Sequence, residues 1–461
     1  MTADVSGYVL DHAAAGGRIA DDAVIEADTG RRISYGGLRN AVDRAAAQYT
    51  ARGLRPGDAV GVRVPNGIGF VVALHAVLSA GGCVVPVNPC HPPPEVRRQL
   101  SLAGAEWTIE ATGDSTTAGP LDRITPPVPP ADPIARSAGL ALLPSSSGTT
   151  GRPKTVGLTH TNLIAALAAG TAALPLAPDD RVLAALPLSH GYGLQAVLHH
   201  TLRCGGTVVT LARYTPQAAV RALGRQGITR LFAVPPMLRT LCAEQRRTRA
   251  PLNALRSVHT GGAPAAAALL METRQALGAP VLMGYGLTET AGYVAVAAGS
   301  GPDAGQSAPF VPGIEHRVVS GELWVRGPQV APGSADGDGW LRTGDLVCLD
   351  GGELRITGRC KELIKTNGYQ VTPIELEEIL IRHPQVADAA VTAVADPNAG
   401  EVPVAYVVLH GPVALEGLAA FVNSEVAPYK RLRRVHAVEV IPRTASGKIM
   451  RHRLVGAGGT P

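Results

Sequence analysis

The sequence predicts an α/β protein: a large N-terminal domain of layered α/β sheets with a small β-rich portion, followed by a small α+β C-terminal domain. Two observations lead to this fold class. At 461 residues the chain is too long for one core of ordinary size. Helix-like and strand-like segments alternate from residue 36, and short β-like runs replace them after residue 305. Such alternation favours a largely parallel sheet covered by helices.

The first alternating segments are a helix, a strand and a second helix. Apolar residues recur at helical spacing in YGGLRNAVDRAAAQYTARG (35–53), whereas DAVGVRVPN (58–66) alternates like a strand. GFVVALHAVLSAGG (69–82) is helical again. Because His75 interrupts it and glycines close it, it predicts a buried helix and not a membrane span. Residues 111–137 are rich in Pro, Thr and Asp without periodicity, and they predict an exposed connection.

The later segments repeat the pattern and then change it. Strand, loop, helix and strand follow again through residues 180–211 and 228–242. GELWVRGPQV (321–330) and GGELRITGRC (351–360) are β-like and are separated by Gly and Asp turns. The last segment predicts a helix over 373–384, strands over 387–396 and 402–410, and a helix near 414–425.

Composition excludes several classes of protein. With 46% hydrophobic and 17% charged residues the chain is globular, and a net charge of +5 without a basic stripe argues against a nucleic-acid partner. The six cysteines form no CxxC pair, which favours reduced structural thiols over a metal site. Without a secretory signal or a membrane span, the protein is expected in the cytoplasm.

The segment SSSGTTGRPKT (145–155) resembles a phosphate-binding loop, but Pro153 stands where a Walker A loop needs glycine. Proline has no N–H to donate, so this loop holds phosphate differently. Hydroxyl donors, flexible glycines and one cation suit the outer phosphates of a nucleotide. These groups belong to Ser145, Ser146, Ser147, Gly148, Thr149, Thr150, Gly151 and Lys154. A flexible surface linker is the alternative interpretation of the same residues.

Four more segments accompany this loop: GYGLTET (284–290), GWLRTGDL (339–346), GRCKELIKTNGYQVTPIELEEIL (358–380) and PRTASGK (442–448). In this order, the five resemble the adenylate-forming superfamily of acyl- and aryl-CoA synthetases, peptide-synthetase adenylation domains and firefly-type luciferases. The resemblance implies that a carboxylate attacks the α-phosphate of ATP, which releases pyrophosphate and leaves an acyl-adenylate. A thiol or an amine then displaces AMP.

The resemblance also implies roles for single residues around the nucleotide. In Gly284-Tyr285-Gly286, the tyrosine would lie against adenine; Thr288 would reach the α-phosphate and Glu289 would help hold Mg²⁺. Asp345 would accept both ribose hydroxyls, and Arg359 would add a cation near ribose and phosphate. A solvated carboxylate at Glu289 and a turn-forming aspartate at Asp345 are the simpler alternatives.

A mobile C-terminal domain is a further implication. The domains would span residues 1–359 and 360–461, with a hinge at Lys361 about which the second domain rotates between adenylate and thioester formation. Gly368 would line a tunnel for the thiol in the second state, unless Asn367-Gly368 is a plain turn. Lys448 would enter the active site in the first state and bridge the carboxylate and the phosphate.

Substrate class follows from a departure within LPLSHGYG (186–193). Peptide-synthetase domains carry a Phe-Asp pair here whose aspartate binds the α-ammonium group of an amino acid, but this chain has Ser189-His190. The resemblance therefore disfavours an α-amino acid and makes His190 the gate of an acyl or aryl pocket. Predicted pocket walls are Val234, Gly261, Gly262 and Tyr293. Thr155, where the family usually has glycine, is a second departure.

Three functions agree with this sequence. The first is an acid–thiol ligase whose acceptor is coenzyme A or the phosphopantetheine of a separate carrier protein. The second is an amide synthetase that passes the adenylate to an amine, and the third is a nucleotide-binding protein without turnover. Retention of Lys154, Glu289, Asp345 and Lys448 argues against the third. The acid is not specified, and either a monomer or a homodimer is expected.

Overall fold

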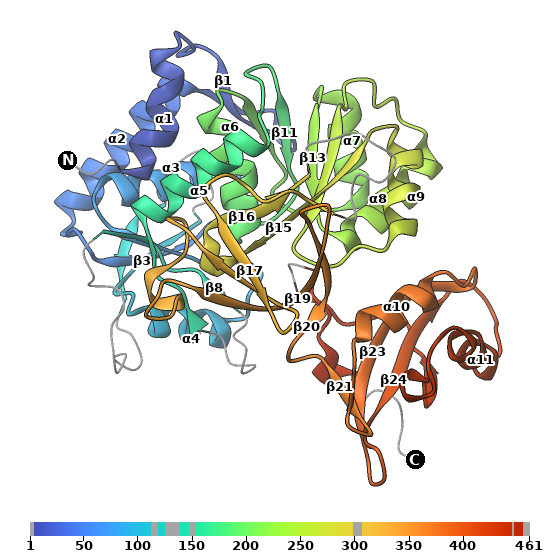
Figure 1. The fold of residues 1–461 in the computed structure, drawn as a ribbon. Coiled ribbons are helices and arrows are strands. Elements are labelled where there is room, and N and C mark those ends of the chain that lie inside the picture. Colours follow the sequence, from blue (N-terminus) through green and yellow to red (C-terminus); the bar gives the residue numbers. More distant parts are fainter. Residues whose placement is uncertain are drawn as a thin grey trace.

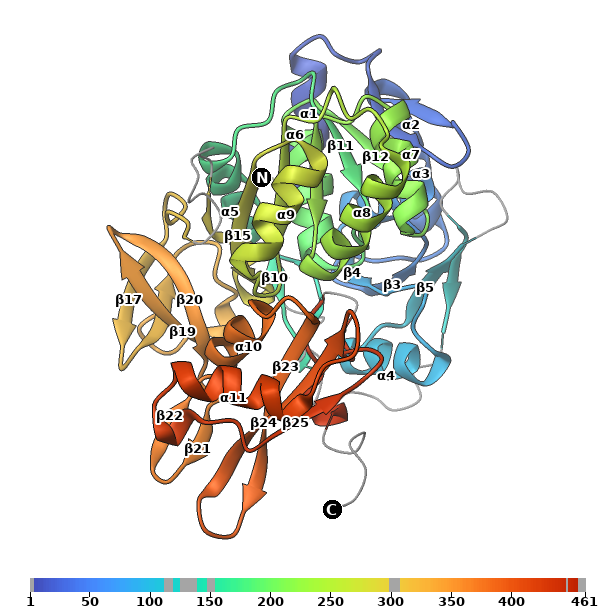
Figure 2. The same ribbon diagram turned by 90° about the vertical axis from the view of Figure 1, so that its right-hand side faces the viewer.

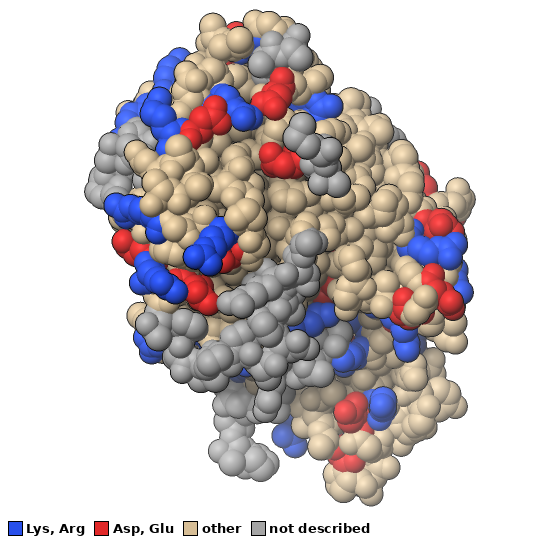
Figure 3. Space-filling model, turned by 90° about the vertical axis from the view of Figure 1, so that its left-hand side faces the viewer, with Lys and Arg blue, Asp and Glu red and all other residues tan. Residues whose placement is uncertain are grey.

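The structure is a computed structural model that describes residues 4–111, 119–124, 139–146, 154–297, 307–444 and 447–454. Figure 1 shows a large body, coloured from blue through yellow into orange at β17 to β20, and a smaller part in deeper orange and red that contains the elements from β21 onward. No helix in these described ranges is both long and apolar enough to cross a membrane. On the face shown in Figure 3, coloured acidic and basic side chains are interspersed among uncharged residues.

The largest sheet has eight strands in the order β16-β15-β14-β13-β11-β12-β1-β2. All neighbours from β15 to β1 are parallel, and the two edge strands are antiparallel. The bounds are β1 (Asp22–Glu26), β2 (Arg32–Ser34), β11 (Arg181–Ala184), β12 (Thr207–Thr210), β13 (Arg230–Ala233), β14 (Ser257–Gly261), β15 (Val281–Leu287) and β16 (Gly292–Val296). Helices α7 (Pro216–Arg225), α8 (Pro235–Thr248) and α9 (Ala267–Leu277) share one apolar cluster with its central strands. The predicted parallel sheet is confirmed.

A second sheet has six strands in the order β10-β7-β4-β3-β5-β6. Its bounds are β3 (Ala59–Arg63), β4 (Cys83–Pro86), β5 (Trp107–Glu110), β6 (Leu121–Arg123), β7 (Leu140–Leu142) and β10 (Leu158–Thr159). Strand β6 corrects the prediction of an exposed connection over 111–137, because Leu121 is buried and β6 pairs with β5. The remaining residues of that segment lie largely outside the described ranges.

Helices between and beside these sheets form the largest apolar core. They are α1 (Val5–Ala15), α2 (Tyr35–Ala51), α3 (Ile68–Ser79), α5 (His160–Ala173) and α6 (His200–Arg203). Helix α4 (Pro93–Ala103) packs in a separate cluster with β4. From Ile68 to Leu78 every residue of α3 is buried, which confirms the predicted buried helix. A π-helix, η2 (Tyr192–His199), leads directly into α6. π-Helices are rare in proteins, and those that occur are often found at functional sites. The region of η2 is therefore a candidate part of the functional site.

A third, four-stranded sheet is antiparallel and follows the chain order β17-β18-β19-β20. Its strands are β17 (Glu315–Val319), β18 (Glu322–Arg326), β19 (Leu341–Asp350) and β20 (Glu353–Arg359). They confirm the predicted β-rich portion after residue 305. This sheet has its own apolar cluster, which includes Leu323, Val325 and Leu354.

The C-terminal part is a separate α+β unit with its own apolar core (Figures 1 and 2). It contains β21 (Ile364–Thr366), β22 (Tyr369–Val371), α10 (Pro373–Ile381), β23 (Val386–Asp396), β24 (Gly400–Leu409), α11 (Leu415–Glu425) and β25 (Arg434–Ala437). The predicted helices and strands of this part are all found. A short turn over residues 360–363, which includes Lys361, is its covalent connection to β20.

Candidate active site

The described ends of the predicted phosphate loop pair with each other as two short strands. Strand β8 (Ser145–Ser146) pairs with β9 (Lys154–Thr155), so Thr155 belongs to the hairpin stem. Lys154 Nζ lies 3.2 Å from Glu289 Oε1, which brings two predicted phosphate and metal residues together. Ser147, Gly148, Thr149, Thr150 and Gly151 lie outside the described residues.

Glu289 and Thr288 occupy a single 3₁₀ turn, η3 (Thr288–Thr290), directly after β15. The Ala331 N–H donates to the Glu289 carbonyl at 2.8 Å and so fixes this turn. Within the described residues, no group of three or more His, Cys, Asp and Glu side chains surrounds a common point. Mg²⁺ usually takes one or two protein carboxylates plus substrate phosphates, so a single Glu289 fits that ion.

Three predicted nucleotide residues form one hydrogen-bonded group. The Tyr285 hydroxyl donates to Asp345 Oδ2 at 2.7 Å, and Arg359 Nε donates to Asp345 Oδ1 at 2.5 Å. Tyr285 belongs to β15 of the eight-stranded sheet, while Asp345 and Arg359 face each other in register on β19 and β20. The group therefore joins two sheets at one point.

Burial and charge shape the protonation of this group. Burial raises the pKa of Tyr285 well above its usual value, and the Asp345 carboxylate adds to that shift. Burial by itself would lower the pKa of Arg359, but Asp345 more than offsets that effect and the pKa rises. The group thus combines a neutral phenol, a carboxylate that can accept hydrogen bonds from ribose hydroxyls, and a guanidinium that can donate to a phosphate.

Lys448 reaches the same place from the C-terminal part. Burial lowers the pKa of Lys448, and the Arg359 guanidinium lowers it further. The carboxylates of Asp345, Glu289 and Glu362 oppose this shift. Because these charges act on Lys448 together, its ammonium group lies within electrostatic reach of the predicted nucleotide and metal residues.

His190 also lies within electrostatic reach of Lys448. Solvent reaches its side chain, yet protein surrounds the ring closely. This environment lowers the pKa of His190 to about 4, mainly by desolvation and then by the charge of Lys448. The imidazole is therefore neutral at physiological pH, and its Nδ1 accepts from the Tyr192 N–H at 3.2 Å.

Contacts between the two parts of the chain hold Lys448 in position. A Cβ on Gly447 would come within 3.1 Å of Pro236 Cδ and 3.3 Å of Val234 Cβ, at the start of α8. Gly447 also has a φ of +83°, which a residue with a side chain rarely adopts. The turn before Lys448 thus packs directly on a predicted pocket wall.

Helix α8 makes a second contact with the C-terminal part. Arg239 donates to the Ala387 carbonyl at 2.6 Å and lies 3.5 Å from an Asp388 oxygen. Arg443, five residues before Lys448, also pairs with Asp388 at 2.9 Å. Asp388 therefore links α8 to the segment that carries Lys448.

The predicted pocket walls also lie near one another. A Cβ on Gly261 would meet the Gly284 carbonyl at 2.5 Å, and a Cβ on Gly284 would meet Tyr293 Cε1 at 2.5 Å. The sequence prediction missed Tyr192, whose ring lies 6.5 Å from that of Tyr293. Its position two residues after His190 was the available clue.

Gly262 and Gly368 have positive φ angles, of +78° and +82°. Asn367 has a φ of +50°, so Asn367-Gly368 forms the turn between β21 and β22 that the simpler interpretation predicts. That hairpin pairs with β24 through Thr366. A role for Gly368 in a thiol tunnel stays a prediction.

Comparison with known proteins identifies the family. Residues 10–334 match the AMP-binding enzyme family and residues 375–448 match the AMP-binding enzyme C-terminal domain. A 4-coumarate–CoA ligase-like protein of Oryza sativa subsp. japonica is 34% identical, over 94% of this chain and 89% of its own. The chain therefore belongs to the AMP-binding enzyme family.

Solved structures agree with this assignment. ATP-bound MatB from Rhodopseudomonas palustris has a TM-score of 0.85 at 25% identity and covers 98% of each chain. The amide bond synthetase McbA from Marinactinospora thermotolerans has a TM-score of 0.83 at 26% identity, over 99% of this chain and all (100%) of its own. The predicted class is confirmed: the chain is an AMP-forming acid–thiol ligase that uses ATP, Mg²⁺ and a thiol acceptor.

Proposed function

We propose that this enzyme activates an acyl or aryl carboxylic acid that lacks an α-amino group and transfers it to the thiol of coenzyme A. In the first step a carboxylate oxygen bonds to the α-phosphorus of ATP, and the bond to the β-phosphate bridging oxygen breaks to release pyrophosphate. In the second step the thiolate sulfur bonds to the acyl carbon. The bond from that carbon to the oxygen that links it to the α-phosphorus breaks, so AMP leaves with this oxygen.

The observation that carries this proposal is the convergence of six predicted residues from distant motifs. Lys154 contacts Glu289, Tyr285 and Arg359 both hydrogen-bond to Asp345, and the charges of Glu289, Asp345 and Arg359 all act on Lys448. A cation held beside these groups offsets the charge that develops when an anionic carboxylate meets an anionic phosphate. A protein that only binds nucleotide has no use for that additional cation.

Each residue of the group has a proposed task. Asp345 receives the ribose hydroxyls, Tyr285 flanks the adenine, and Thr288 with Arg359 faces the α-phosphate. Glu289 would hold Mg²⁺, which neutralises phosphate charge when it is bound. Lys154 lies with the hairpin that leads into the serine- and glycine-rich loop, where the outer phosphates are expected. Neutral His190 is proposed to border the pocket that receives the carboxylic acid.

Residues 1–359 and 360–461 are proposed to act as two bodies joined at Lys361. The contacts of Gly447 with the start of α8, and of Arg239 in α8 with Ala387, correspond to the adenylate-forming arrangement, because they bring Lys448 to the nucleotide residues. Thioester formation would follow a rotation that withdraws Lys448.

The absence of an aspartate after Ser189 supports the exclusion of α-amino acids, since nothing at His190 offers an anion to an ammonium group. Coenzyme A is the proposed acceptor because the curated relative is named as a CoA ligase-like protein. A carrier-protein phosphopantetheine offers the same thiol. The similarity to an amide bond synthetase makes an amine the second candidate acceptor.

The decisive experiment is carboxylate-dependent exchange of labelled pyrophosphate into ATP, screened over acyl, aryl and α-amino acids. Exchange with one or more acids that lack the α-amino group, abolished by EDTA, is expected. Formation of ADP and phosphate, or a preference for a free amino acid, would contradict the proposal. Acceptors are then supplied separately to the preformed adenylate: coenzyme A, a phosphopantetheinylated carrier, and simple amines.

A further inference from the structure

Strand β18 carries a buried carboxylate, Glu322, whose side chain is 9% exposed. It belongs to GELWVRGPQV (321–330), which the sequence predicts only as a β-like run. Its Oε2 accepts from Arg342 Nη2 at 2.9 Å and from the Trp324 indole Nε1 at 3.1 Å. Its Oε1 accepts instead from the backbone N–H of Gly344 at 3.0 Å. Glu322 therefore connects β18 to the residue directly before Asp345.

Asp345 lies in an irregular stretch of β19. Trp324 of β18 faces Arg342 of β19, whereas Glu322, two residues earlier, faces Leu346, which is four residues further along β19. Strand β19 therefore contains more residues than β18 between these two pairs, which makes a β-bulge. Bulges change the direction of a side chain and are common next to active sites. The direction of the Asp345 carboxylate thus depends on how this bulge is held.

Hydrogen bonds outside the regular ladder hold the backbone of the bulge. Its backbone groups need such partners because a bulge interrupts the pairing of the strands. The Asp345 N–H donates to the Thr343 hydroxyl at 3.1 Å. The Gly344 carbonyl accepts from the Cys360 N–H at 2.8 Å, at the start of the turn that leads to the C-terminal part. Glu322 holds the Gly344 N–H, so this glycine is fixed on both of its backbone polar groups.

The direction of the Asp345 carboxylate matters because part of its hydrogen-bonding capacity is already used. Its side chain is 5% exposed, and it accepts from the Tyr285 hydroxyl and from Arg359 Nε. A carboxylate has about four lone-pair sites, so about two remain for ribose hydroxyls. Hydrogen bonds weaken steeply as they bend. A small rotation of the bulge would therefore weaken the ribose contacts.

A glutamate carboxylate suits position 322 better than the side chains most similar to it. The Gly344 N–H, the Arg342 guanidinium and the Trp324 indole are all donors, and an ionised carboxylate accepts at both oxygens. Glutamine offers one oxygen and one NH₂ group, so it would set a donor against a donor on one side. Aspartate keeps the charge but is one methylene shorter, so it cannot span the same contacts. Arg342 also supplies the cation that a buried anion requires.

We infer that Glu322 is a positioning residue: through the Gly344 backbone, it orients the Asp345 carboxylate toward the ribose hydroxyls of the nucleotide. The inference rests on the proposed function, since it takes Asp345 as the ribose residue. It adds a residue that lies outside the predicted site and acts on the nucleotide through another side chain. A structural link that only holds β18 to β19 is the competing interpretation.

The test compares nucleotides that differ only in their ribose. Isothermal titration calorimetry measures the Kd of AMP, 2′-deoxy-AMP and 3′-deoxy-AMP, and pyrophosphate exchange measures kcat/KM for ATP and its two deoxy analogues. Removal of a ribose hydroxyl is expected to weaken binding to the wild-type protein by about 10- to 100-fold, the usual effect of a hydrogen bond to a charged group. The ribose ratio is the Kd of a deoxy nucleotide divided by that of AMP. A purely structural link would affect all nucleotides alike and leave this ratio unchanged.

Glu322→Gln should bring the ribose ratio to within about threefold of one, because the Asp345 carboxylate no longer points at the hydroxyls. Glu322→Asp keeps the charge beside Arg342 and should still lower the ratio by at least about threefold, because the shorter side chain loses a contact. Glu315→Gln is the matched control. Glu315 pairs with Arg326 on the same sheet but is exposed, so its ratio should equal that of the wild type.

A double variant tests the route through Asp345. Asp345→Asn by itself should lower the ribose ratio, and the addition of Glu322→Gln should lower it no further. A further fall would show that Glu322 acts on the ribose by another route, and it would overturn the inference.

A wild-type ribose ratio in Glu322→Gln would overturn the inference and leave the proposed function intact. A wild-type ratio in Glu322→Asp would do the same, because charge alone would then suffice. The aspartate variant also decides the case if the glutamine variant does not fold. A ratio near one in the wild-type protein would remove Asp345 from the ribose site and overturn the inference with it. Exchange with no acid of any kind would overturn the proposed function, while calorimetry would still decide on Glu322.

Discussion

The two halves of the candidate site are held in different ways. Asp345 and Arg359 face each other in the register of two antiparallel strands, and Tyr285 reaches them from a neighbouring sheet. Lys448, in contrast, is positioned by a turn that packs on α8 from another part of the chain. The first group depends on sheet register within one body, and the second depends on docking between two.

This difference suggests that the residues proposed to bind the nucleotide can be changed independently of the lysine proposed to catalyse adenylate formation. Sheet register persists whenever the N-terminal part is folded, so the nucleotide residues stay assembled through the whole cycle. In the proposed rotation, the docked Lys448 is available in one arrangement and withdrawn in the other. Changes at the two halves should therefore affect different half-reactions, which gives four experiments of decreasing expected effect.

The largest effect is expected at Lys448. Lys448→Ala should slow acyl-adenylate formation by at least about two orders of magnitude, the usual loss when a preorganised charge-stabilising group is removed. Thioester formation from a chemically supplied acyl-adenylate should stay within a few fold. Pyrophosphate exchange and thioester assays measure the two steps, and Lys365→Ala, at an exposed lysine of the same part, is the control. Equal losses in both steps would contradict the assigned role.

The second-largest effect is expected for Asp345→Asn, which should weaken nucleotide binding. Loss of the carboxylate weakens charge-assisted hydrogen bonds and should lower kcat/KM for ATP by about 10- to 100-fold, with a small change in KM for the acid. Asp350→Asn changes the exposed end of the same strand and should behave like wild type. The melting temperatures of both variants show whether the loss of the carboxylate partner of Arg359 has destabilised the protein. An unchanged kcat/KM for ATP would remove Asp345 from the ribose site.

Lys361→Pro should reverse the pattern seen with Lys448→Ala. Proline restricts φ in the turn between β20 and β21, so rotation is hindered while the docked arrangement is kept. Adenylation should be spared and thioester formation slowed several-fold. Lys361→Ala keeps backbone freedom and separates the loss of the side chain from the loss of rotation. Damage to both half-reactions alike would argue against a hinge at this residue.

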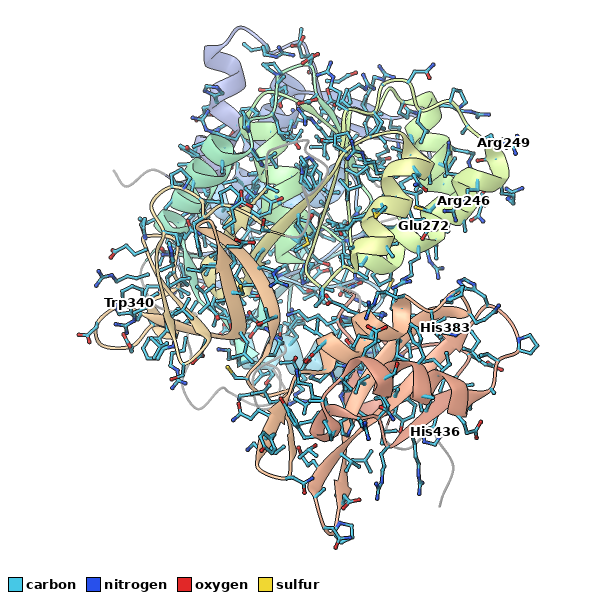
Figure 4. The ribbon with its side chains drawn as sticks, turned by 45° about the vertical axis from the view of Figure 1, so that its right-hand side comes forward. Arg246, Arg249, Glu272, Trp340, His383 and His436 are labelled. Carbon is cyan, nitrogen blue, oxygen red and sulfur yellow. The ribbon has the colours of Figure 1, made fainter. Side chains whose placement is uncertain are left out.

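The smallest effect is expected at the docking contact of α8. Arg239→Ala removes the hydrogen bond to Ala387 and should slow adenylation by about two- to fivefold, as expected for a partly exposed pair worth about 0.5–1 kcal/mol. Thioester formation should not fall. Arg246, labelled in Figure 4, lies one heptad later on the same helix and pairs with Glu272 of α9. Arg246→Ala is therefore a control with the same chemistry and no part in docking; an equal effect of the two variants would count against the docking role.

Much of the fold could be predicted because it is encoded locally. Apolar spacing predicted α2, α3 and β3, and turn residues predicted the antiparallel strands after residue 305. Strand β6 was missed because three residues among prolines, threonines and glycines show no periodicity. Leu121 is buried there only because β5 offers it a partner.

The sequence by itself determined which residues are predicted to carry the chemistry, since the loop at 145–155 and the segments around Tyr285, Asp345 and Lys448 are local motifs. Only the tertiary structure decided which of them meet. Tyr285 and Asp345 are 60 residues apart, and their hydrogen bond requires two sheets to lie at a defined angle and register. The buried environment of Lys448 likewise arises from packing between the two parts of the chain. Local patterns specify what a segment can form, whereas contacts between distant segments depend on how every intervening element packs.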